Sequence, residues 1–329
     1  MSLDVLVPAA ARRRRRRYRL RRLAPLLAVI LAALVAGAVF GARRVANDAR
    51  AHHPAPRLRA VVRTLPQSKP RPQPLLHGPP LLRGRLGKRL LAKAAILVDA
   101  RTGRVLWEKR PHERRPVAST TKIMTALLAL KEVPWRRVVT VNRAVTHVPL
   151  VREGLRKGEH VRAWKLFYSL LLYSGNDDAA QLAISSAGSH GAFIAQMNAE
   201  AHRLGLRDTH YTSASGVRDR GNFSSAWDLA ALTRYALRNP VFRRIVRRKR
   251  IEVPWSPPTN AKVYVNNNLL LRLYPGADGV KTGYTHAAGW CLVASATRHG
   301  RRLIAVVLDS ANIYADATAL LNLGFRGAA

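Results

Sequence analysis

Short apolar runs bounded by turn-forming residues occur at two places that are far apart in the chain. The first pair of strands is predicted at 95–99 and 104–107, and the second at 290–296 and 303–308. Each run is four to seven residues long, the usual length of a strand in a globular protein. The pattern therefore predicts strands from both ends of one domain.

Between these strands, apolar residues recur every three or four positions, which is the spacing of an amphipathic helix. The predicted helices span 120–131, 163–173, 177–186, 191–204 and 226–237, and a closing helix spans 314–323. Strands at both ends with helices between them predict an α+β fold. We expect an antiparallel sheet built from both chain ends, flanked by helices, with an inserted helical region.

Residues 23–42 are uncharged and mostly apolar, long enough to cross a bilayer as a helix. The arginine run 12–17 precedes them, which favours a cytoplasmic position for residues 1–22. We expect a cell-membrane protein with a single N-terminal pass and its C-terminal body outside the cytoplasm. Because Ala36-Gly37-Ala38 resembles a cleavage site, the alternative is a cleaved signal segment and a secreted body.

Residues 43–92 are rich in proline and arginine and show little helical or strand periodicity. Such a composition is typical of an extended linker. The folded domain is therefore predicted to span 93–329.

The 329 residues include 57 Lys+Arg and 18 Asp+Glu, for a net charge of +39. Of the basic residues, 22 lie within 1–93, where an exported protein carries its topology signal, so we expect no specific nucleic-acid partner. The single cysteine, Cys291, excludes an internal disulfide framework and a multi-cysteine metal site. The histidines lack metal-binding spacing, and we expect no metal and no cofactor.

The first candidate for chemistry is Ser119, three residues before Lys122 at the predicted start of a helix. This spacing places both side chains on one side of a turn. A lysine whose pKa is lowered by burial or by a second cation can take the serine proton and create a nucleophile. Because S-x-x-K alone is common, Ser119 could equally be a simple helix N-cap.

The second candidate is Ser174-Gly175-Asn176, after the helix predicted at 163–173. Ser174 offers a hydroxyl for proton relay, and the Asn176 amide suits a substrate peptide group. Gly175 and Asn176 also tolerate a left-handed turn, so the alternative is a plain C-terminal cap.

The third candidate is Lys281-Thr282-Gly283, which leads to Tyr284. Lys281 would supply the second positive charge near Lys122, and Thr282 a hydroxyl for an anionic group. Gly283 would let a peptide lie against a strand edge. The alternative is a solvated lysine in a β-turn.

Taken together, these three motifs occur in the order, and on the elements, of a known group of serine enzymes. The chain resembles the serine-type D-alanyl-D-alanine carboxypeptidases, which are low-molecular-mass penicillin-binding proteins related to the serine β-lactamases. The resemblance runs from about residue 94 to the C-terminus. It includes ASTTKIMTALLAL, GLRKGEHVRAWKLFYSLLLYSGNDDAA, MNAEAHRLGLRDTHYTSASG and GADGVKTGYTHAAGWCLVASA.

The resemblance implies an acyl-transfer cycle on peptidoglycan stem peptides. Ser119 is the implied nucleophile, Lys122 its base, and Ser174 the relay to the leaving D-alanine. Substrate-binding roles are implied for Asn176, Lys281, Thr282, Gly283 and Tyr284, and backbone N–H groups of Ser119 and Tyr284 are the implied oxyanion donors. β-Lactam antibiotics are the implied covalent inhibitors.

One position departs from the family pattern. Many relatives carry a substrate-binding arginine where this chain has Ile313. The substrate carboxylate is then left to Thr282, to Lys281 or to another arginine such as Arg272.

Other functions explain the sequence less fully. A β-lactamase needs a base for deacylation, and the expected Glu-x-x-Leu-Asn signature is missing after the second motif. A DD-endopeptidase would use the same residues. A non-catalytic cationic module that binds cell wall or DNA would account for the charge but not for three ordered motifs.

Overall fold

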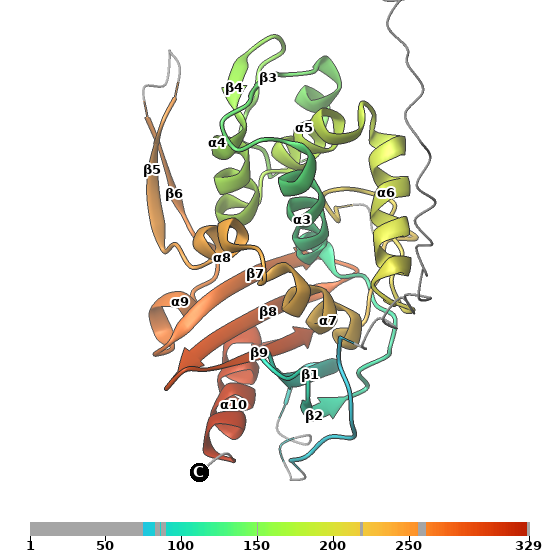
Figure 1. Ribbon diagram of the computed structural model, residues 1–329, viewed down its shortest axis with the longest axis vertical. Helices are drawn as coiled ribbons and strands as arrows, with labels where there is room; N and C mark the ends of the chain where they lie inside the picture. The colour runs from blue at the N-terminus through green and yellow to red at the C-terminus, as the bar shows by residue number, and fades with distance from the viewer. Residues whose placement is uncertain are drawn as a thin grey trace, which may run out of the picture. The chain divides into compact units, whose positions relative to one another are not determined.

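The core of the fold is a five-stranded antiparallel sheet in the order β2-β1-β9-β8-β7 (Figure 1). This computed structural model describes residues 75–82, 86, 90–149, 151–217, 220–255 and 261–327. The strands are β1 (Ala94–Asp99), β2 (Val105–Lys109), β7 (Ala277–Thr285), β8 (Gly289–Arg298) and β9 (Arg301–Leu308). Pairing of β1 with β9 joins the two ends of the domain. The predicted α+β class and the sheet built from both ends are confirmed.

Alternating side chains divide the interior between the two faces of the sheet. Ile96 and Val306 pair across β1 and β9 and point into a core shared with α3 (Lys122–Glu132). The neighbouring pair, Leu97 and Ala305, points into a second core under α10 (Ile313–Arg326). Because the side-chain period of a strand is two, apolar residues at every position cover both faces of a buried sheet.

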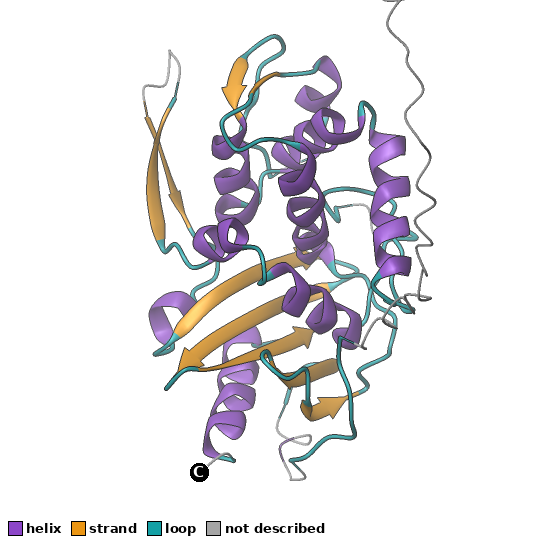
Figure 2. Cartoon of the chain, in the orientation of Figure 1, coloured by secondary structure: helices purple, strands orange, loops and turns teal. Residues whose placement is uncertain are grey.

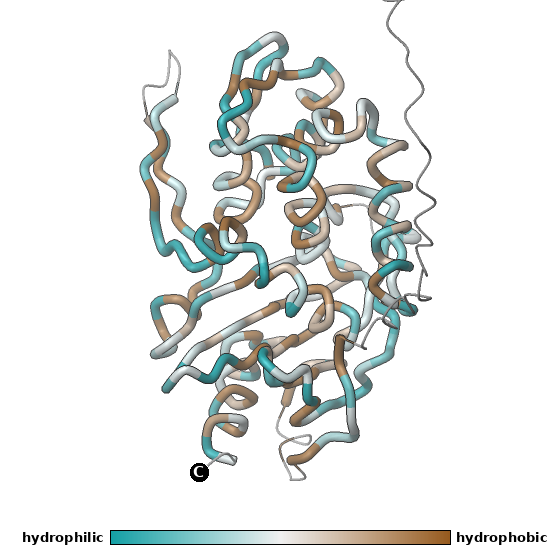
Figure 3. Tube along the Cα trace, in the orientation of Figure 1, coloured by the Kyte–Doolittle hydropathy of each residue, from teal (hydrophilic) through white to brown (hydrophobic). Residues whose placement is uncertain are grey.

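Most helices lie on the α3 side of the sheet, and α10 lies on the other (Figure 2). The helices α4 (Ala163–Tyr168), α5 (Asn176–Ala187), α6 (His190–Arg203), α7 (Ala226–Ala236) and α8 (Pro240–Val246) share the α3 side, whereas α9 (Leu270–Leu273) packs Leu270 into the core under α10. Two 3₁₀ segments, η1 (Ala118–Thr121) and η2 (Arg143–His147), and one π segment, η3 (Ser169–Tyr173), complete this side. The tube of α6 alternates between hydrophobic and hydrophilic colours, as its period predicts (Figure 3).

The structure differs from the pattern analysis at several short elements. The helix predicted at 163–173 changes to a π turn at η3. The sequence analysis did not predict α8 or α9. It also missed two small hairpins, one formed by β3 (Val138–Thr140) and β4 (His160–Arg162), the other by β5 (Arg250–Pro254) and β6 (Ala261–Val265).

Each of these missed elements contains only a few buried residues. The central residue of β3, Val139, is buried between two exposed neighbours. The β5–β6 hairpin follows the same pattern, because Val253 and Tyr264 are buried while most of the flanking residues face solvent. Helix α8 is only seven residues long, and the side chain of Asn239 caps its N-terminus. Elements this short carry too few apolar positions for a period to be recognised.

The packed domain begins before the predicted boundary at Lys93. Leu76 and Leu90 are buried, and the Leu82 amide donates a hydrogen bond to the Leu106 carbonyl of β2. The predicted cytoplasmic tail, the segment 23–42 and most of the predicted linker lie outside the described residues. Within the described ranges, no helix combines the length and the apolar character needed to cross a bilayer.

A buried carboxylate ties the chain that enters β1 to the last helix. Asp316 on α10 accepts hydrogen bonds from the amides of Leu91 and Ala92, at 3.1 and 2.7 Å, and from the Ser310 hydroxyl at 2.7 Å. The side chain of Asp316 therefore satisfies three donors at the edge of the second core.

We expect Asp316→Ala to lower the free energy of unfolding by about 2–4 kcal/mol, because three donors lose their acceptor. Urea unfolding measures the change. Asp316→Asn keeps one acceptor oxygen and should lose less. Glu108→Ala, which removes a partly exposed carboxylate from β2, is the control and should change stability by no more than about 0.5 kcal/mol. Equal losses in Asp316→Ala and in the control would contradict this account.

Candidate active site

Ser119 and Lys122 meet where η1 passes into α3. The Lys122 amine donates a hydrogen bond to Ser119 Oγ at 2.8 Å. Ser119 makes no capping hydrogen bond to the first turn of either segment, so the structure does not support the N-cap alternative. The pair therefore has the geometry of a nucleophile and its base.

Lys122 is fully buried, and its amine is surrounded by oxygen atoms. It donates to Asn176 Oδ1 at 2.8 Å and to the Ser215 carbonyl at 2.9 Å, in addition to Ser119. Burial lowers the pKa of Lys122 well below its usual value, and the positive charge of Lys281 lowers it further. The ammonium form can donate to all three oxygens, whereas the neutral amine has two hydrogens for Asn176 Oδ1 and the Ser215 carbonyl and a lone pair that can accept the Ser119 hydroxyl proton.

Lys281 lies on β7 and is also buried, with its amine donating to the Thr282 carbonyl at 2.9 Å. Burial lowers the pKa of Lys281 to about 7. Lys122 responds to the charge of Lys281, whereas burial alone accounts for the lowered pKa of Lys281.

Ser174 directly follows η3 and has a left-handed backbone, with φ of 78°. The alternative considered from the sequence was a C-terminal cap with a left-handed turn at Gly175 or Asn176; the structure has the left-handed residue at Ser174, and Gly175 has φ of −58°. Gly175 is required for space instead: a Cβ there would lie 1.9 Å from the Asp178 carboxylate. A left-handed serine is energetically unfavourable, and such residues are common at functional sites.

Asn176, at the start of α5, is already engaged through both ends of its amide. Its Oδ1 accepts from Lys122, and its Nδ2 donates to the Pro149 carbonyl at 3.0 Å. The sequence analysis assigned Asn176 to substrate binding. In the structure its contacts are those of a residue that positions the Lys122 amine.

Gly283 brings the edge strand β7 against the segment that carries Ser119. A Cβ on Gly283 would lie 3.0 Å from both the Ser119 amide nitrogen and the Val117 carbonyl oxygen. β7 pairs with β8 on one side only, so its other edge faces the serine. Such an edge can accept an extended peptide as a further strand.

The two residues beside Gly283 differ in exposure. Thr282 is buried next to Lys281, whereas Tyr284 is 46% exposed. The Tyr284 ring packs against Trp290, with centroids 4.5 Å apart. Lys281 pairs with Val293 of the core shared with α3, whereas Thr282 pairs with Leu292 of the core under α10, so the two side chains lie on opposite faces of the strand. The Tyr284 side chain lies at the exposed surface.

Ile313 and Arg272 do not supply an obvious carboxylate-binding group. Ile313 is buried in the core under α10, on the opposite face of the sheet from α3. Arg272 is exposed on α9, and its positive charge lies close enough to Tyr314 to favour ionisation of that hydroxyl, against the effect of burial, which raises the pKa of Tyr314. Of the groups considered from the sequence, Lys281 lies on the α3 side of the sheet.

Two contributions to the site were not assigned from the sequence. The Ser215 carbonyl holds Lys122, and the Asp177 carboxylate accepts hydrogen bonds from the backbone amides of Glu153, Gly154 and Leu155. Ser215 belongs to a stretch that carries the family resemblance, but a backbone carbonyl leaves no signature in residue type. Asp177 directly follows Asn176 in the second motif, and this adjacency is the sequence feature that could have identified it.

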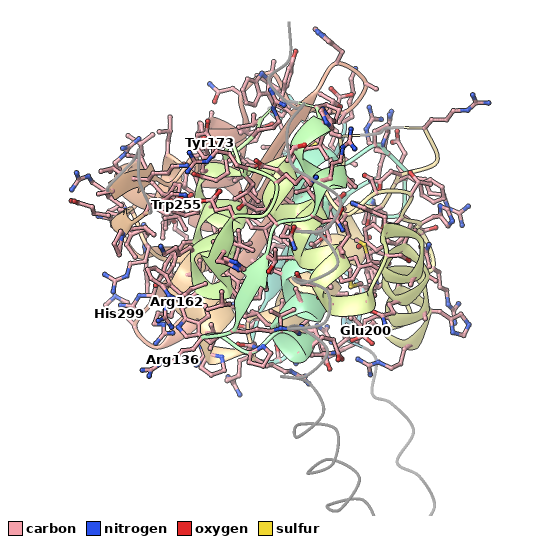
Figure 4. All side chains as sticks on the ribbon, turned by 90° about the horizontal axis from the view of Figure 1, so that it is seen from above. Arg136, Arg162, Tyr173, Glu200, Trp255 and His299 are labelled. Atoms are coloured by element: carbon pink, nitrogen blue, oxygen red, sulfur yellow. The ribbon has the colours of Figure 1, made fainter. Side chains whose placement is uncertain are left out.

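Tyr173 and Trp255 are two aromatic residues next to the β5–β6 hairpin. Tyr173, before Ser174, packs near Tyr264 of β6, and Trp255 donates its indole N–H to Glu159 at 2.9 Å. In the view from above, Tyr173 and Trp255 lie on one side of the domain and Glu200 of α6 on the other (Figure 4).

We expect the buried Lys281 to make stability depend on pH. Between about pH 7 and pH 10 the unfolded chain holds the lysine proton and the folded chain does not, so the free energy of unfolding rises with pH. Lys281→Met removes this contribution. The stability of wild type relative to the variant should therefore rise by about 4 kcal/mol across that window.

Urea unfolding at several pH values measures this difference. Lys262→Met, which removes a lysine paired with Glu153, is the control for a general effect of charge. A difference between wild type and Lys281→Met that does not change with pH would contradict a buried, neutral Lys281.

Comparison with known proteins places this geometry in a family. A family sequence profile described as D-alanyl-D-alanine carboxypeptidase matches residues 85–312. The chain is 34% identical over 225 residues to the D-alanyl-D-alanine carboxypeptidase DacF of Bacillus subtilis, covering 67% of this chain and 57% of DacF, so it spans little more than half the length of that relative. It is 37% identical over 219 residues to DacB2 of Mycobacterium tuberculosis, covering 66% of this chain and 74% of DacB2.

A solved structure agrees with these relatives. The crystal structure of a Streptomyces DD-transpeptidase superposes with a TM-score of 0.68 at 33% identity, covering 72% of this chain and 98% of that protein. The resemblance stated from the three motifs is confirmed. The chain belongs to the D-alanyl-D-alanine carboxypeptidase family of serine peptidases.

Proposed function

We propose that this protein is a serine-type D-alanyl-D-alanine carboxypeptidase that removes the terminal D-alanine from peptidoglycan stem peptides. The observation that carries the proposal is the buried Lys122 amine, hydrogen-bonded to Ser119 Oγ at 2.8 Å. Family membership supports the same activity.

Acylation begins with proton transfer from Ser119 to neutral Lys122. The Ser119 oxygen attacks the carbonyl between the two D-alanines, and a tetrahedral intermediate forms. The backbone N–H groups of Ser119 and Tyr284 are the proposed oxyanion donors, and one such donor stabilises the transition state by about 3–4 kcal/mol. The close contact at Gly283 supports this arrangement because it holds β7 beside the Ser119 amide.

Collapse of the intermediate breaks the peptide C–N bond. The Lys122 proton passes through the Ser174 hydroxyl to the leaving nitrogen, and D-alanine departs. Thr282 and the Lys281 amine are the proposed partners of the substrate carboxylate, whose negative charge favours the protonated form of Lys281. Water then hydrolyses the ester on Ser119. β-Lactams present a similar acyl group, so we expect them to acylate Ser119 and to leave slowly.

We also propose that residues 23–42 hold this domain at the outer side of the cell membrane. The support is the apolar segment and the arginines before it. This position matches a substrate that lies outside the cytoplasm.

We expect Ser119→Ala to abolish both labelling by a fluorescent penicillin and release of D-alanine from a stem pentapeptide. Lys122→Ala should slow acylation by at least about 1000-fold, because the serine loses its base. Ser186→Ala removes a hydroxyl bonded within α5 and serves as the control, with unchanged labelling. Near-normal acylation of Lys122→Ala would show that the base is misassigned. Labelling without D-alanine release from wild type would favour another activity, such as the DD-endopeptidase.

We expect Gly283→Ala to lower the acylation rate constant by about 10- to 100-fold, because the new methyl group pushes β7 away from the Ser119 amide. A time course of penicillin labelling, quenched at successive times, measures the acylation rate constant. Gly191→Ala is the matched control, since a Cβ at Gly191 meets no atom within 4 Å. An unchanged acylation rate in Gly283→Ala would refute the close approach as a catalytic requirement.

A further inference from the structure

A strongly cationic surface lies outside the active site, on α8 and at the start of β5. Residues 234–250 contain eight arginines and lysines and no acidic residue. We use the name arginine face for the part of this surface formed by Arg243, Arg244, Arg247, Arg248, Lys249 and Arg250. Phe242, Ile245 and Val246 anchor α8 in the core, so the remaining side chains of the helix face outward.

The charges at the end of the arginine face are not compensated. Arg247, Arg248, Lys249 and Arg250 are all exposed, and their side chains make no hydrogen bond or ion pair with any residue that the structure describes. Arg301 and Arg302, by contrast, pair with Asp99 and Asp278. Adjacent unpaired cations repel one another, and an anion bound among them would relieve that repulsion.

Three neighbouring hollows run along this surface. The first, of about 500 Å³, is lined by Arg244 and the four residues 247–250. The second, of about 460 Å³, shares Arg247 and Lys249 with the first and also includes Arg243 and Arg302. The third, of about 470 Å³, shares Arg243 and Arg302 with the second. The hollows therefore form a row rather than one isolated pocket.

The acidic residue that lines this row, Asp278, already accepts hydrogen bonds from neighbouring side chains. Asp278 lines the second hollow and accepts hydrogen bonds from Ser295, Thr297 and Arg302. An anion entering the row would therefore meet guanidinium and ammonium groups without a free carboxylate among these lining residues. Planar guanidinium groups bind phosphate oxygens in pairs, which gives both affinity and geometry.

The arginine face also lies near the catalytic strand. α8 packs on β7, where a Cβ on Gly279 would lie 3.2 Å from Val246. Asp278 is three residues before Lys281 on β7, a separation of about 10 Å along a strand. A polymer bound along the hollows would therefore hold the enzyme by a surface adjacent to its active site.

We propose that the arginine face binds a linear phosphodiester polymer of the cell envelope. A flexible chain can place successive phosphates in a row of hollows, whereas a planar bilayer meets only the ridges between them. Nucleic acid shares the phosphodiester chemistry, but the proposed substrate lies outside the cytoplasm. The proposal goes beyond the proposed function, and only the choice of an envelope polymer rests on it.

The test uses the full chain in a non-ionic detergent and fluorescently labelled poly(glycerol phosphate) as the probe. The face variant carries Arg247→Gln, Arg248→Gln, Lys249→Gln and Arg250→Gln. The control removes four exposed cations elsewhere, by Arg143→Gln, Lys157→Gln, Arg207→Gln and Arg220→Gln. The arginines of residues 1–22 are present in both, so their contribution to binding is the same.

We expect the face variant to bind the probe at least about tenfold more weakly than wild type, and the control less than about threefold more weakly, near 0.1 M salt. The slope of log affinity against log salt should fall by about 3 in the face variant, because each cation that contacts a phosphate releases a counterion. Thermal melting establishes that both variants are folded. Ser119→Ala should bind like wild type, so loss of catalysis leaves this result unaffected.

Equal weakening in the face variant and the control would overturn the proposal, because binding would then reflect net charge alone. Tighter binding of duplex DNA with the same number of phosphates would reassign the surface to nucleic acid. Binding to phosphatidylglycerol vesicles without binding to the polymer would reassign it to a membrane. Either result would refute an envelope polymer as the partner.

Discussion

The site depends on an amine that the fold keeps away from water. Lys122 can act as a base only because its surroundings favour the neutral form, and burial with a second buried lysine provides that preference. Three oxygen atoms from three separate segments then fix the position of the amine. The 3₁₀ turn that carries Ser119 and the Asn176 amide both contribute to this position. Any change that admits water beside Lys122 would return its pKa toward the usual value and remove the base.

A second constraint is the close approach of the sheet edge to the serine. β7 and η1 are distant in sequence, and they meet because β1 pairs with β9 and so closes the domain. The absence of a side chain at Gly283 lets the strand reach the Ser119 amide. The helical side of the domain supplies the base, and the sheet supplies the peptide edge. The active site is therefore a property of the interface between two layers, and the sheet that forms one of them has a hydrophobic core on each face.

The apolar periodicity predicted the strands β1, β2, β8 and β9 because they are largely buried, and it predicted the longer helices because each has an apolar side. It did not predict α8 or the β5–β6 hairpin, because most of their residues are exposed and only a few apolar side chains are buried, too few to form a recognisable period. The three motifs include Ser119, Lys122, Asn176 and Gly283, which the structure brings close to one another. The left-handed Ser174 and the carbonyl of Ser215 could not be predicted in this way. A backbone conformation or a carbonyl oxygen depends on the surrounding fold and not on residue type.

The link between Asp316 and the amides of Leu91 and Ala92 bears on how the domain responds to mechanical load. Tension that arrives through the N-terminal chain meets contacts such as the Leu82–Leu106 hydrogen bond first, and then this clamp and β1. β1 is flanked by β2 and β9, so a pull along its axis loads both ladders in shear, with many hydrogen bonds sharing the force at once. β7 lies two strands beyond β9, at the far edge of the sheet. The peptide-binding edge is thereby insulated from forces that arrive through the N-terminal chain.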